Sequence, residues 1–287
     1  MIQHKIPNNQ EKQRWIPAFA GMTLGGGYTF RISRIRVGAP VVSPRSVFLY
    51  VTEDESRRGT HPKLERRKVI MIPDIYPRKV PKAILFDWDN TLVDTWRIVF
   101  DSMNVAREAT GHPTFTVEEF WQRPHHSMRD TADELFGDHV EKGMGIFYDL
   151  VEKSHLEKIE VLEGAEALLK NLKSQGIYVG VVSNKDGYHL RKEVSHLGWD
   201  SHFTRVVGAR DTEADKPSPI PVLAALKDSM ILPSHDVWFV GDSIVDVLCA
   251  RASGCIPIVV GQGEASQQDD VVHAKDCSGL MNLLTRL

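Results

Sequence analysis

The sequence predicts an α/β protein with a mostly parallel sheet covered by helices on both faces, and a small all-helical segment inserted after the first strand. From Ala83 onward, short apolar runs bounded by Gly, Asp, Ser or Asn alternate with longer amphipathic stretches. This alternation is typical of buried parallel strands joined by crossover helices. About 90 residues separate the first two runs, far more than one crossover helix requires, and this gap predicts the inserted segment.

Five short apolar runs are expected to form the strands. They are AILF (83–86), IYVGVV (177–182), FTRVVG (203–208), VWFVG (237–241) and IPIVV (256–260). Three stretches with helical periodicity lie between the last four runs and are expected to cover the sheet. Pro219 fits the first turn of one of these helices, and Gly254 fits the end of another.

The inserted segment, residues 95–176, reads as helical throughout. Stretches such as TWRIVFDSMNVAREATG and GAEALLKNLKSQG have the apolar spacing of an amphipathic helix. We therefore expect an α/β core made of residues 79–94 and 177–287, with residues 95–176 forming a separate helical domain.

Residues 1–78 are expected to be a poorly ordered basic extension. Prolines, a GGG run and clustered basic residues interrupt every candidate element, and no hydrophobic period is sustained. The piece RWIPAFAGMT resembles peptides translated from dispersed bacterial repeat elements. This resemblance favours an extension outside the native protein, with Met71 as the true start. The alternative is a basic arm that binds nucleic acid or acidic lipid.

The overall composition is that of an ordinary globular protein, with 42% apolar and 25% charged residues in a chain of 287. The net charge of −3 is unevenly distributed, with 16 Lys and Arg against 6 Asp and Glu up to Lys82, and 19 against 32 after it. Cys249, Cys255 and Cys277 show no CxxC or framework spacing, which indicates reduced thiols and a cytoplasmic protein. No apolar run approaches the roughly 20 residues that span a bilayer, and the N-terminus lacks a secretory pattern.

Polar residues follow the predicted strands at their carboxyl ends, where open parallel sheets bind ligands. Two acids, Asp87 and Asp89, follow the first strand, and Lys216 comes shortly after the third. The full set is Asp87, Asp89, Ser183, Asn184, Lys185, Lys216, Asp242, Ser243 and Asp246. Taken singly, each is more often a turn residue, a helix cap or a surface side chain. The joint pattern indicates a site.

This set combines the groups that phosphoryl transfer requires. A carboxylate can act as a covalent nucleophile and divide one difficult step into two easier ones. Carboxylates at two strand ends can hold Mg²⁺, a hard ion that prefers oxygen ligands. A lysine and backbone N–H groups can bind the remaining phosphoryl oxygens. A second carboxylate near the bridging oxygen can protonate the leaving group and later activate water.

Four motifs, in this order, resemble those of the haloacid dehalogenase (HAD) superfamily. They are FDWDNTLVDT (86–95), VVSNKDG (181–187), DKPSP (215–219) and VGDSIVD (240–246). Within the superfamily, the chain from about residue 80 to its end looks like the phosphoglycolate-phosphatase-like hydrolases with a helical cap. The resemblance implies a Rossmann-like α/β core, with residues 95–176 as a cap that closes over the site, excludes water and contacts the non-phosphate part of the substrate.

The resemblance also implies roles for the acidic residues. Asp87 would be the nucleophile, and Asp89 the general acid and base. Mg²⁺ would be held by Asp87, by the backbone carbonyl of Asp89 and by Asp242. Asp246 would lie outside these direct ligands and reach the ion through water. Dehalogenases of the superfamily lack an acid at the position of Asp89, so a carboxylate there favours phosphate chemistry.

The phosphate-binding residues implied by the resemblance come from two other strand ends. Ser183 and the backbone N–H of Asn184 would bind the phosphoryl group, and Lys216 would neutralise the nucleophile and the phosphate. Asn90 stands where many members of the superfamily have Gly. Because Asn tolerates the left-handed backbone region better than most residues, we interpret it as a permitted variant.

Substrate contacts are expected in the stretch FWQRPHHSMRD of the cap. The candidates are Trp121, Arg123, His125, His126 and Arg129. Among them we prefer Arg123 and Arg129 as direct contacts, and the alternative is a solvated loop whose arginines make surface pairs. No metal-site spacing links the two histidines to Cys or other ligands, so we expect no zinc site.

The sequence therefore predicts a cytoplasmic, Mg²⁺-dependent phosphoric monoester hydrolase that forms an aspartyl-phosphate. Its substrate would be a small phosphorylated metabolite, either phosphoglycolate-like or a sugar phosphate. We expect a monomer or homodimer with no membrane or nucleic-acid partner. A phosphomutase on the same scaffold is an alternative that the motifs do not separate, and Asp89 and Lys216 together disfavour 2-haloacid dehalogenase chemistry. A basic-arm binding protein is the alternative from another class.

Overall fold

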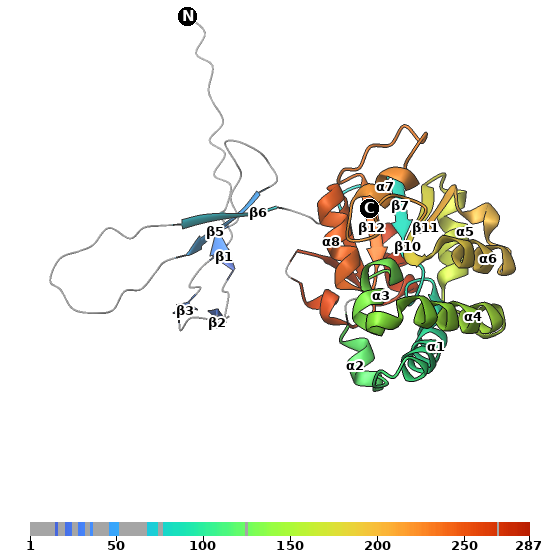
Figure 1. Cartoon of the computed structure of the whole chain (residues 1–287). Helices are drawn as coiled ribbons and strands as arrows, with labels where there is room; N and C mark the ends of the chain where they lie inside the picture. The colour runs from blue at the N-terminus through green and yellow to red at the C-terminus, as the bar shows by residue number, and fades with distance from the viewer. Residues whose placement is uncertain are drawn as a thin grey trace, which may run out of the picture. The chain divides into compact units, whose positions relative to one another are not determined.

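The computed structural model of the chain describes residues 77–123, 126–268 and 270–287, together with the backbone of six short strands between residues 15 and 73. The chain divides into two compact units, Met1–Asp74 and Ile75–Leu287, which are described separately (Figure 1). Every residue to which the sequence assigns a chemical role belongs to the second unit.

The described strands of the first unit form three antiparallel pairs, β1 with β4, β2 with β3, and β5 with β6. Their bounds are Trp15–Ile16 (β1), Gly21–Leu24 (β2), Tyr28–Arg31 (β3), Ile35–Arg36 (β4), Ser46–Val51 (β5) and Lys68–Pro73 (β6). Most of residues 1–78, the predicted extension or basic arm, lies outside the described residues, and its role stays a prediction.

A six-stranded parallel sheet forms the centre of the second unit. Its strand order is β11-β10-β7-β12-β13-β14, and every neighbouring pair is parallel. The bounds are Ala83–Phe86 (β7), Tyr178–Asp186 (β10), Arg205–Ala209 (β11), Val237–Gly241 (β12), Ile256–Val260 (β13) and Val272–Ala274 (β14). The five predicted runs thus form five of these strands, and β14 is an additional short edge strand.

β7 lies inside the sheet because it is apolar on both faces. All four of its residues are fully buried, and β10 and β12 pair with it from either side. Successive side chains of a strand point to opposite faces. Accordingly, Ile84 and Phe86 belong to one hydrophobic cluster, whereas Ala83 and Leu85 belong to another.

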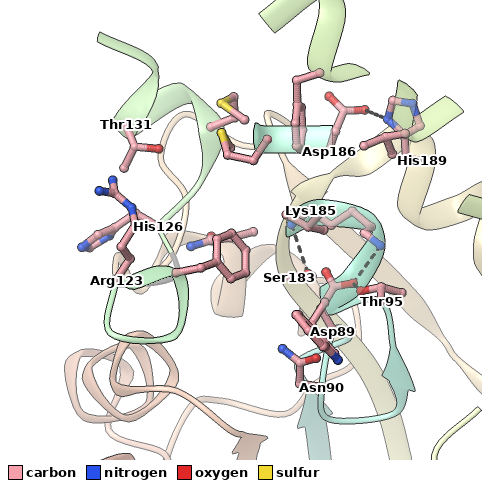
Figure 2. Close-up of a pocket in the computed structure, with 18 of the residues that line it drawn as sticks. Asp89, Asn90, Thr95, Arg123, His126, Thr131, Ser183, Lys185, Asp186 and His189 are labelled. Atoms are coloured by element: carbon pink, nitrogen blue, oxygen red, sulfur yellow. Dashed lines mark hydrogen bonds and ion pairs between the residues drawn. The ribbon is translucent and has the colours of Figure 1, made fainter. Parts of the chain in front are cut away.

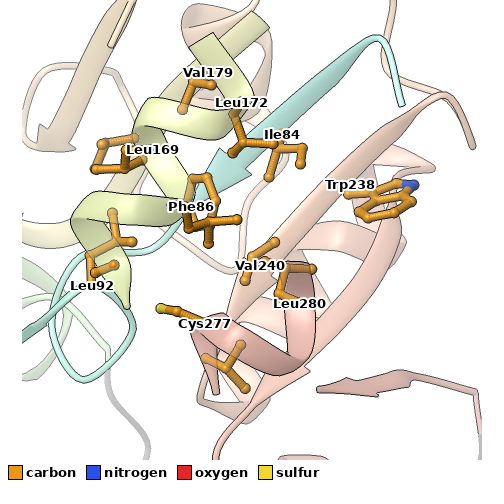
Figure 3. Close-up of a cluster of buried hydrophobic side chains, with 14 of the residues drawn as sticks. Ile84, Phe86, Leu92, Leu169, Leu172, Val179, Trp238, Val240, Cys277 and Leu280 are labelled. Carbon is orange, nitrogen blue, oxygen red and sulfur yellow. The ribbon is translucent and has the colours of Figure 1, made fainter. Parts of the chain in front are cut away.

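Helices cover both faces of the sheet, as predicted. α5, α6 and α9 contribute to the cluster around Phe86 (Figure 3), and α7 and α8 contribute to the cluster around Leu85. Their bounds are Ala165–Ser174 (α5), Gly187–His196 (α6), Ile220–Ala225 (α7), Ile244–Ser253 (α8) and Cys277–Leu284 (α9). Two short 3₁₀ helices, Asp200–His202 (η2) and Glu264–Gln267 (η3), lie in the connections.

Four helices between the first two strands of the sheet pack on one another. They are Trp96–Ala109 (α1), Val117–Trp121 (α2), Met128–Phe136 (α3) and Val140–Lys158 (α4), with a 3₁₀ turn at Gly137–His139 (η1). Their cluster includes Met103, Phe136 and Phe147 and is separate from the two sheet clusters. The segment begins after Val93–Asp94 (β8) and ends before Glu160–Val161 (β9), which pair antiparallel, so both of its ends lie together.

α5 packs on the sheet and not with the other helices of residues 95–176, which the sequence predicts to form one helical domain. Its Leu168, Leu169 and Leu172 are fully buried in the cluster that contains Phe86. An amphipathic pattern shows that a helix has an apolar face but not which partner covers it. We therefore propose that the inserted domain consists of α1 to α4.

The three cysteines are buried and form no disulfide. Burial raises the pKa of Cys249 to about 12 and that of Cys277 to about 11, so both are protonated thiols at neutral pH. Within the described ranges, no helix has the length and apolar character needed to cross a bilayer.

Candidate active site

The parallel strands bring the predicted site residues to one edge of the sheet. Asp87 directly follows β7, Ser183 lies near the end of β10, and Asp242 directly follows β12. Because β10, β7 and β12 are neighbours and parallel, their carboxyl ends meet at this edge. Lys216, in the connection between β11 and α7, reaches the same point.

Lys216 connects two acids that are far apart in the sequence. Its Nζ donates to Asp87 Oδ1 and to Asp246 Oδ1, both at 2.7 Å. All three side chains are buried. Burial alone would lower the pKa of Lys216, but the charges of Asp246 and Asp87 raise it above its usual value. The lysine is therefore a fixed cation at neutral pH.

The side chain of Asn184 holds the backbone of Lys216 in place. Its Oδ1 accepts from Lys216 N at 2.9 Å, and its Nδ2 donates to Lys216 O at 3.1 Å. Ser183 is buried, and its Oγ accepts from Lys185 N at 3.1 Å. The role expected for Asn184 is phosphate binding through its backbone N–H, and its side chain adds this clamp.

Three carboxylates gather around the nucleophile position, and their donor set fits a hard divalent cation. One oxygen from each of Asp87, Asp242 and Asp246 lies within 4.8 Å of the others. Asp242 Oδ1 is buried and has no hydrogen-bond partner among the described residues. A buried carboxylate oxygen without a donor is expected where a cation binds.

The raised pKa values of two of these acids agree with this fit. Burial, followed by the nearby charges of Asp246 and Asp87, raises the pKa of Asp242 well above its usual value. Burial also raises the pKa of Asp87 to about 7, although Lys216 acts in the opposite direction. One lysine is therefore insufficient to compensate three carboxylates, and the residues present would accommodate a hard divalent cation such as Mg²⁺.

Asp246 belongs to this carboxylate cluster, and its oxygens already have partners. Besides Lys216, it accepts from Ser243 N at 3.0 Å and from Ser243 Oγ at 2.6 Å. This is the capping box at the start of α8. The predicted metal set was Asp87, Asp89 and Asp242, so the structure adds Asp246 to the acids close enough to share an ion.

Replacing Asp242 with Asn is expected to uncouple thermal stability from Mg²⁺. In the wild-type protein, Mg²⁺ at about 100 times its Kd should contribute about 2.7 kcal/mol and raise the Tm by roughly 5 to 10 °C. Asp242→Asn should lose most of this shift. Without metal, however, its Tm should equal or exceed that of the wild type, because a buried carboxylate with a raised pKa is removed.

The pH dependence of the metal-free protein follows from the same shifts. A folded-state pKa above the unfolded value contributes stability that is lost as pH rises through the folded pKa. The Tm in EDTA should therefore fall as pH rises from 3.8, the usual pKa of an aspartate, to about 7, the pKa of Asp87 in the folded protein. Differential scanning calorimetry with and without Mg²⁺ measures both effects, and Asp228→Asn, an exposed acid paired with Arg205, is the matched control. An unchanged Mg²⁺ shift in Asp242→Asn would remove Asp242 from the metal site.

The turn that carries Asp89 is tightly fixed. The carbonyl of Trp88 accepts from the backbone N–H groups of residues 91–93. Asn90 has a φ of 58°, which confirms its interpretation as a residue that tolerates the left-handed region. Asp89 Oδ1 accepts a hydrogen bond from Thr95 Oγ1 and pairs with Lys185 Nζ at 2.7 Å.

A cavity of about 200 Å³ lies between the sheet edge and the inserted helices. Asp87, Asp89, Ser183 and Lys216 line its polar end. The inserted domain lines the other end with apolar side chains, among them Met103, Phe115, Phe120, Leu135, Phe147 and Val151. Figure 1 shows α1 to α4 gathered at one end of the sheet. The cavity therefore has the layout of a phosphate end and a separate end for the rest of a substrate.

The predicted cap residues have different positions. Arg123 and His126 line the cavity, and Figure 2 shows them across it from Lys185. Arg123 also donates to Glu134 at 2.8 Å, while Trp121 packs against Trp96 with ring centroids 5.4 Å apart. His125 lies outside the described residues.

Arg129 joins the inserted domain to the core instead of lining the described cavity. Its Nε donates to Asp215 Oδ2 at 3.0 Å, and its Nη1 donates to the carbonyl of Thr212 at 3.2 Å. Asp215 directly precedes Lys216 and is buried. Arg129 therefore ties α3 to the connection that carries the site lysine.

The open parallel sheet, the acids at neighbouring strand ends and the cavity under an inserted helical domain define an α/β protein with a site suited to phosphoryl transfer. The chain belongs to the haloacid dehalogenase-like hydrolase family, whose model matches residues 84–260. The predicted family is thereby confirmed.

Relatives with assigned names support the same class. A phosphoglycolate phosphatase of Xylella fastidiosa is 29% identical, and the match covers 66% of this chain and 84% of that one. A phosphoglycolate phosphatase of Chromobacterium violaceum is 30% identical and covers 64% and 86%. A Caldanaerobacter subterraneus protein provisionally named a pyrophosphatase is also 30% identical, covering 62% and 80%. The chain is a hydrolase of this family, and these relatives carry phosphatase or pyrophosphatase names.

Solved structures share the fold. The crystal structure of a HAD-superfamily hydrolase from Ehrlichia chaffeensis is 31% identical, with a TM-score of 0.52, and the match covers 74% of this chain and 99% of that one. A HAD-superfamily hydrolase from Geobacter sulfurreducens is 23% identical, with a TM-score of 0.56 and coverage of 71% and 100%. The second similarity concerns the fold alone, and both confirm the predicted Rossmann-like core.

Proposed function

We propose that the protein is a Mg²⁺-dependent phosphatase that hydrolyses a small phosphorylated metabolite through an aspartyl-phosphate on Asp87. The observation that carries this proposal is the position of Lys216 Nζ, 2.7 Å from both Asp87 Oδ1 and Asp246 Oδ1 at the polar end of the cavity. A fixed cation beside a buried carboxylate allows a phosphate dianion to approach that carboxylate.

In the first step, a carboxylate oxygen of Asp87 forms a bond to phosphorus, and the bond from phosphorus to the leaving-group oxygen breaks. Asp89 donates a proton to that oxygen as it departs. Ser183 and the backbone N–H of Asn184 bind phosphoryl oxygens, and Lys216 compensates their charge. Mg²⁺, held by Asp87, the Asp89 carbonyl and Asp242 with Asp246 close by, would neutralise developing negative charge.

In the second step, water attacks the phosphorus of the aspartyl-phosphate, and Asp89, now ionised, accepts a proton from that water. The bond between phosphorus and the Asp87 oxygen breaks, which releases phosphate and restores the Asp87 carboxylate. Asp89 thus returns to its protonated form for the next turnover. The apolar end of the cavity excludes bulk water and contacts the leaving group.

We retain the predicted cytoplasmic location and the predicted monomer or homodimer as parts of this proposal. Three buried free cysteines support a reducing compartment. Among the cap residues, Arg123 and His126 line the cavity and are the side chains that we propose to meet the polar part of the substrate.

A panel of phosphorylated compounds, compared by kcat/KM with Mg²⁺ and with EDTA, tests the proposal. The panel contains phosphoglycolate, sugar phosphates, p-nitrophenyl phosphate and inorganic pyrophosphate. We expect Mg²⁺-dependent phosphate release from at least one small monoester. Interconversion of sugar phosphates without phosphate release would indicate a mutase, and chloride release from 2-chloropropionate without Mg²⁺ would indicate a dehalogenase.

A further inference from the structure

Lys185 takes part in a buried ion pair beside Asp89 that the steps above do not use. Its Nζ lies 2.7 Å from Asp89 Oδ1 and 2.8 Å from both carboxylate oxygens of Glu193. The side chain of Lys185 is 8% exposed, and that of Glu193 is 0% exposed. Removing two charges from water is unfavourable unless further hydrogen bonds complete the pair, so the other contacts of Glu193 matter.

Glu193, on α6, is held by side chains from two other parts of the chain. Trp88 Nε1 donates to Glu193 Oε2 at 2.6 Å, and His155 Nδ1, from α4, lies 2.8 Å from Glu193 Oε1. Trp88 stands between Asp87 and Asp89, and its own carbonyl is fixed by the turn. The network therefore joins the turn of the two acids to α4 and α6.

The ion pair is charged at neutral pH. Burial alone would raise the pKa of Glu193, but the charge of Lys185 and hydrogen bonds from His155, Lys185 and Trp88 lower it below its usual value. Burial alone would lower the pKa of Lys185, but Asp89 and Glu193 raise it. The geometry thus holds the Lys185 amine between the Glu193 carboxylate and Asp89.

We propose that Lys185, held by Glu193, is a positioning residue that orients the Asp89 carboxyl for proton transfer to the leaving group. This inference rests on the proposed function, in which Asp89 is the acid. Lys185 Nζ and Thr95 Oγ1 both contact Asp89 Oδ1, and Figure 2 shows the three side chains together at one side of the cavity. Two contacts on one oxygen restrict rotation of the carboxyl group, and a displacement of about 1 Å can cost about 10²-fold in rate.

The test uses two substrates that differ in their need for an acid. p-Nitrophenolate is a stable anion and leaves without a proton, whereas an alkoxide must be protonated as it leaves. Because kcat/KM covers the steps up to departure of the leaving group, it reports the acid role of Asp89. The alkyl substrate is the alkyl phosphate with the highest kcat/KM in the panel above, and Asp89→Asn gives the reference pattern of selective loss.

Lys185→Met is expected to reproduce that selective loss. Its kcat/KM should fall by about 10²-fold for the alkyl phosphate and by less than about threefold for p-nitrophenyl phosphate. The matched control is Lys192→Met, on α6 next to Glu193, which removes a lysine paired with Glu152 and not with Asp89. Glu193→Gln keeps the shape of the side chain and should show a smaller loss of kcat/KM that is again selective for the alkyl phosphate. This variant replaces Lys185→Met in the test if Lys185→Met does not fold.

Three results would overturn the proposal, and they have different meanings. Equal loss on both substrates in Lys185→Met or Glu193→Gln, with Asp89→Asn still selective, would reduce the network to a support of the fold. A non-selective Asp89→Asn would remove the acid role that Lys185 is proposed to serve. No Mg²⁺-dependent phosphate release by the wild-type protein from any panel compound would refute the proposed function itself.

Discussion

Replacing Asp87 with Asn is expected to reduce kcat/KM for p-nitrophenyl phosphate by at least about 10⁴-fold, the scale seen when a covalent nucleophile is removed. Asn has almost the same shape but cannot form the bond to phosphorus. Asp87 is buried at the end of β7, and its Oδ1 accepts from Lys216 Nζ at 2.7 Å. The nearby Asp246 is held by Lys216 and by Ser243 at the start of α8.

The loss in Asp87→Asn should occur without unfolding. Circular dichroism and the Tm in EDTA should show a folded protein, because the change removes one of three crowded carboxylates. Asp101→Asn, on the exposed face of α1 where Asp101 pairs with Arg97, is the matched control and should retain activity. Wild-type activity in Asp87→Asn would end the assignment of Asp87 as the nucleophile.

Replacing Lys216 with Met is expected to impair both catalysis and stability. The phosphoryl group and Asp87 would lose their fixed cation, and kcat/KM should fall by about 10³-fold. Asp87 and Asp246 would remain buried without a counter-charge, and breaking a buried ion pair in this way typically costs about 3 to 5 kcal/mol. Urea unfolding and phosphate release measure the two effects.

The stability loss in Lys216→Met should depend on pH in a defined direction. Lys216 lowers the pKa of Asp87, which is still raised to about 7 in its presence. Without Lys216 the pKa of Asp87 rises further. Asp87 is then largely protonated, and therefore neutral, at pH values below this raised pKa, and it is ionised at pH values above it. In EDTA, the destabilisation should therefore grow as pH rises from about 6 to about 8. Lys227→Met, at an exposed position just beyond α7, is the control, and wild-type stability of Lys216→Met at high pH would contradict this account.

The core of the fold could be predicted because buried parallel strands are continuous apolar runs. All five predicted runs form strands of the sheet. β14 was missed because it has only three residues, and its central His273 is exposed, so it forms no apolar run. The partner of α5 could not be predicted either, since its leucines show a buried face but not that the sheet covers it.

The candidate site could be predicted where residues directly follow strands. Asp87, Ser183 and Asp242 meet because their strands are parallel neighbours, which is a general property of such sheets. Lys185 was noted at a strand end but received no role. Its partner Glu193 lies on α6 and meets Trp88 across 105 positions of sequence. Contacts of this kind depend on how helices pack and have no local sequence signal.

The contact made by Arg129 also depends on how helices pack and has no local sequence signal. The sequence placed it in a cap segment rich in polar residues, where substrate contact and surface pairing were both open. In the structure its guanidinium pairs with buried Asp215 across 86 positions. Whether Arg129 faces the cavity depends on the rotation of α3 over the core, which the segment FWQRPHHSMRD does not specify.

The central claim is that Asp87 carries the phosphoryl group, while Asp89 acts as the acid in the first step and as the base in the second. Pre-steady-state kinetics of Asp89→Asn with p-nitrophenyl phosphate and Mg²⁺ test this claim most directly. Phosphorylation of Asp87 needs no acid with this substrate, but hydrolysis of the aspartyl-phosphate needs Asp89 as a base. We predict a burst of p-nitrophenolate equal to the enzyme concentration, followed by slow turnover. Mass spectrometry should find one phosphoryl group on the peptide that contains Asp87. Steady turnover without a burst and with no phosphoryl group on that peptide would contradict it.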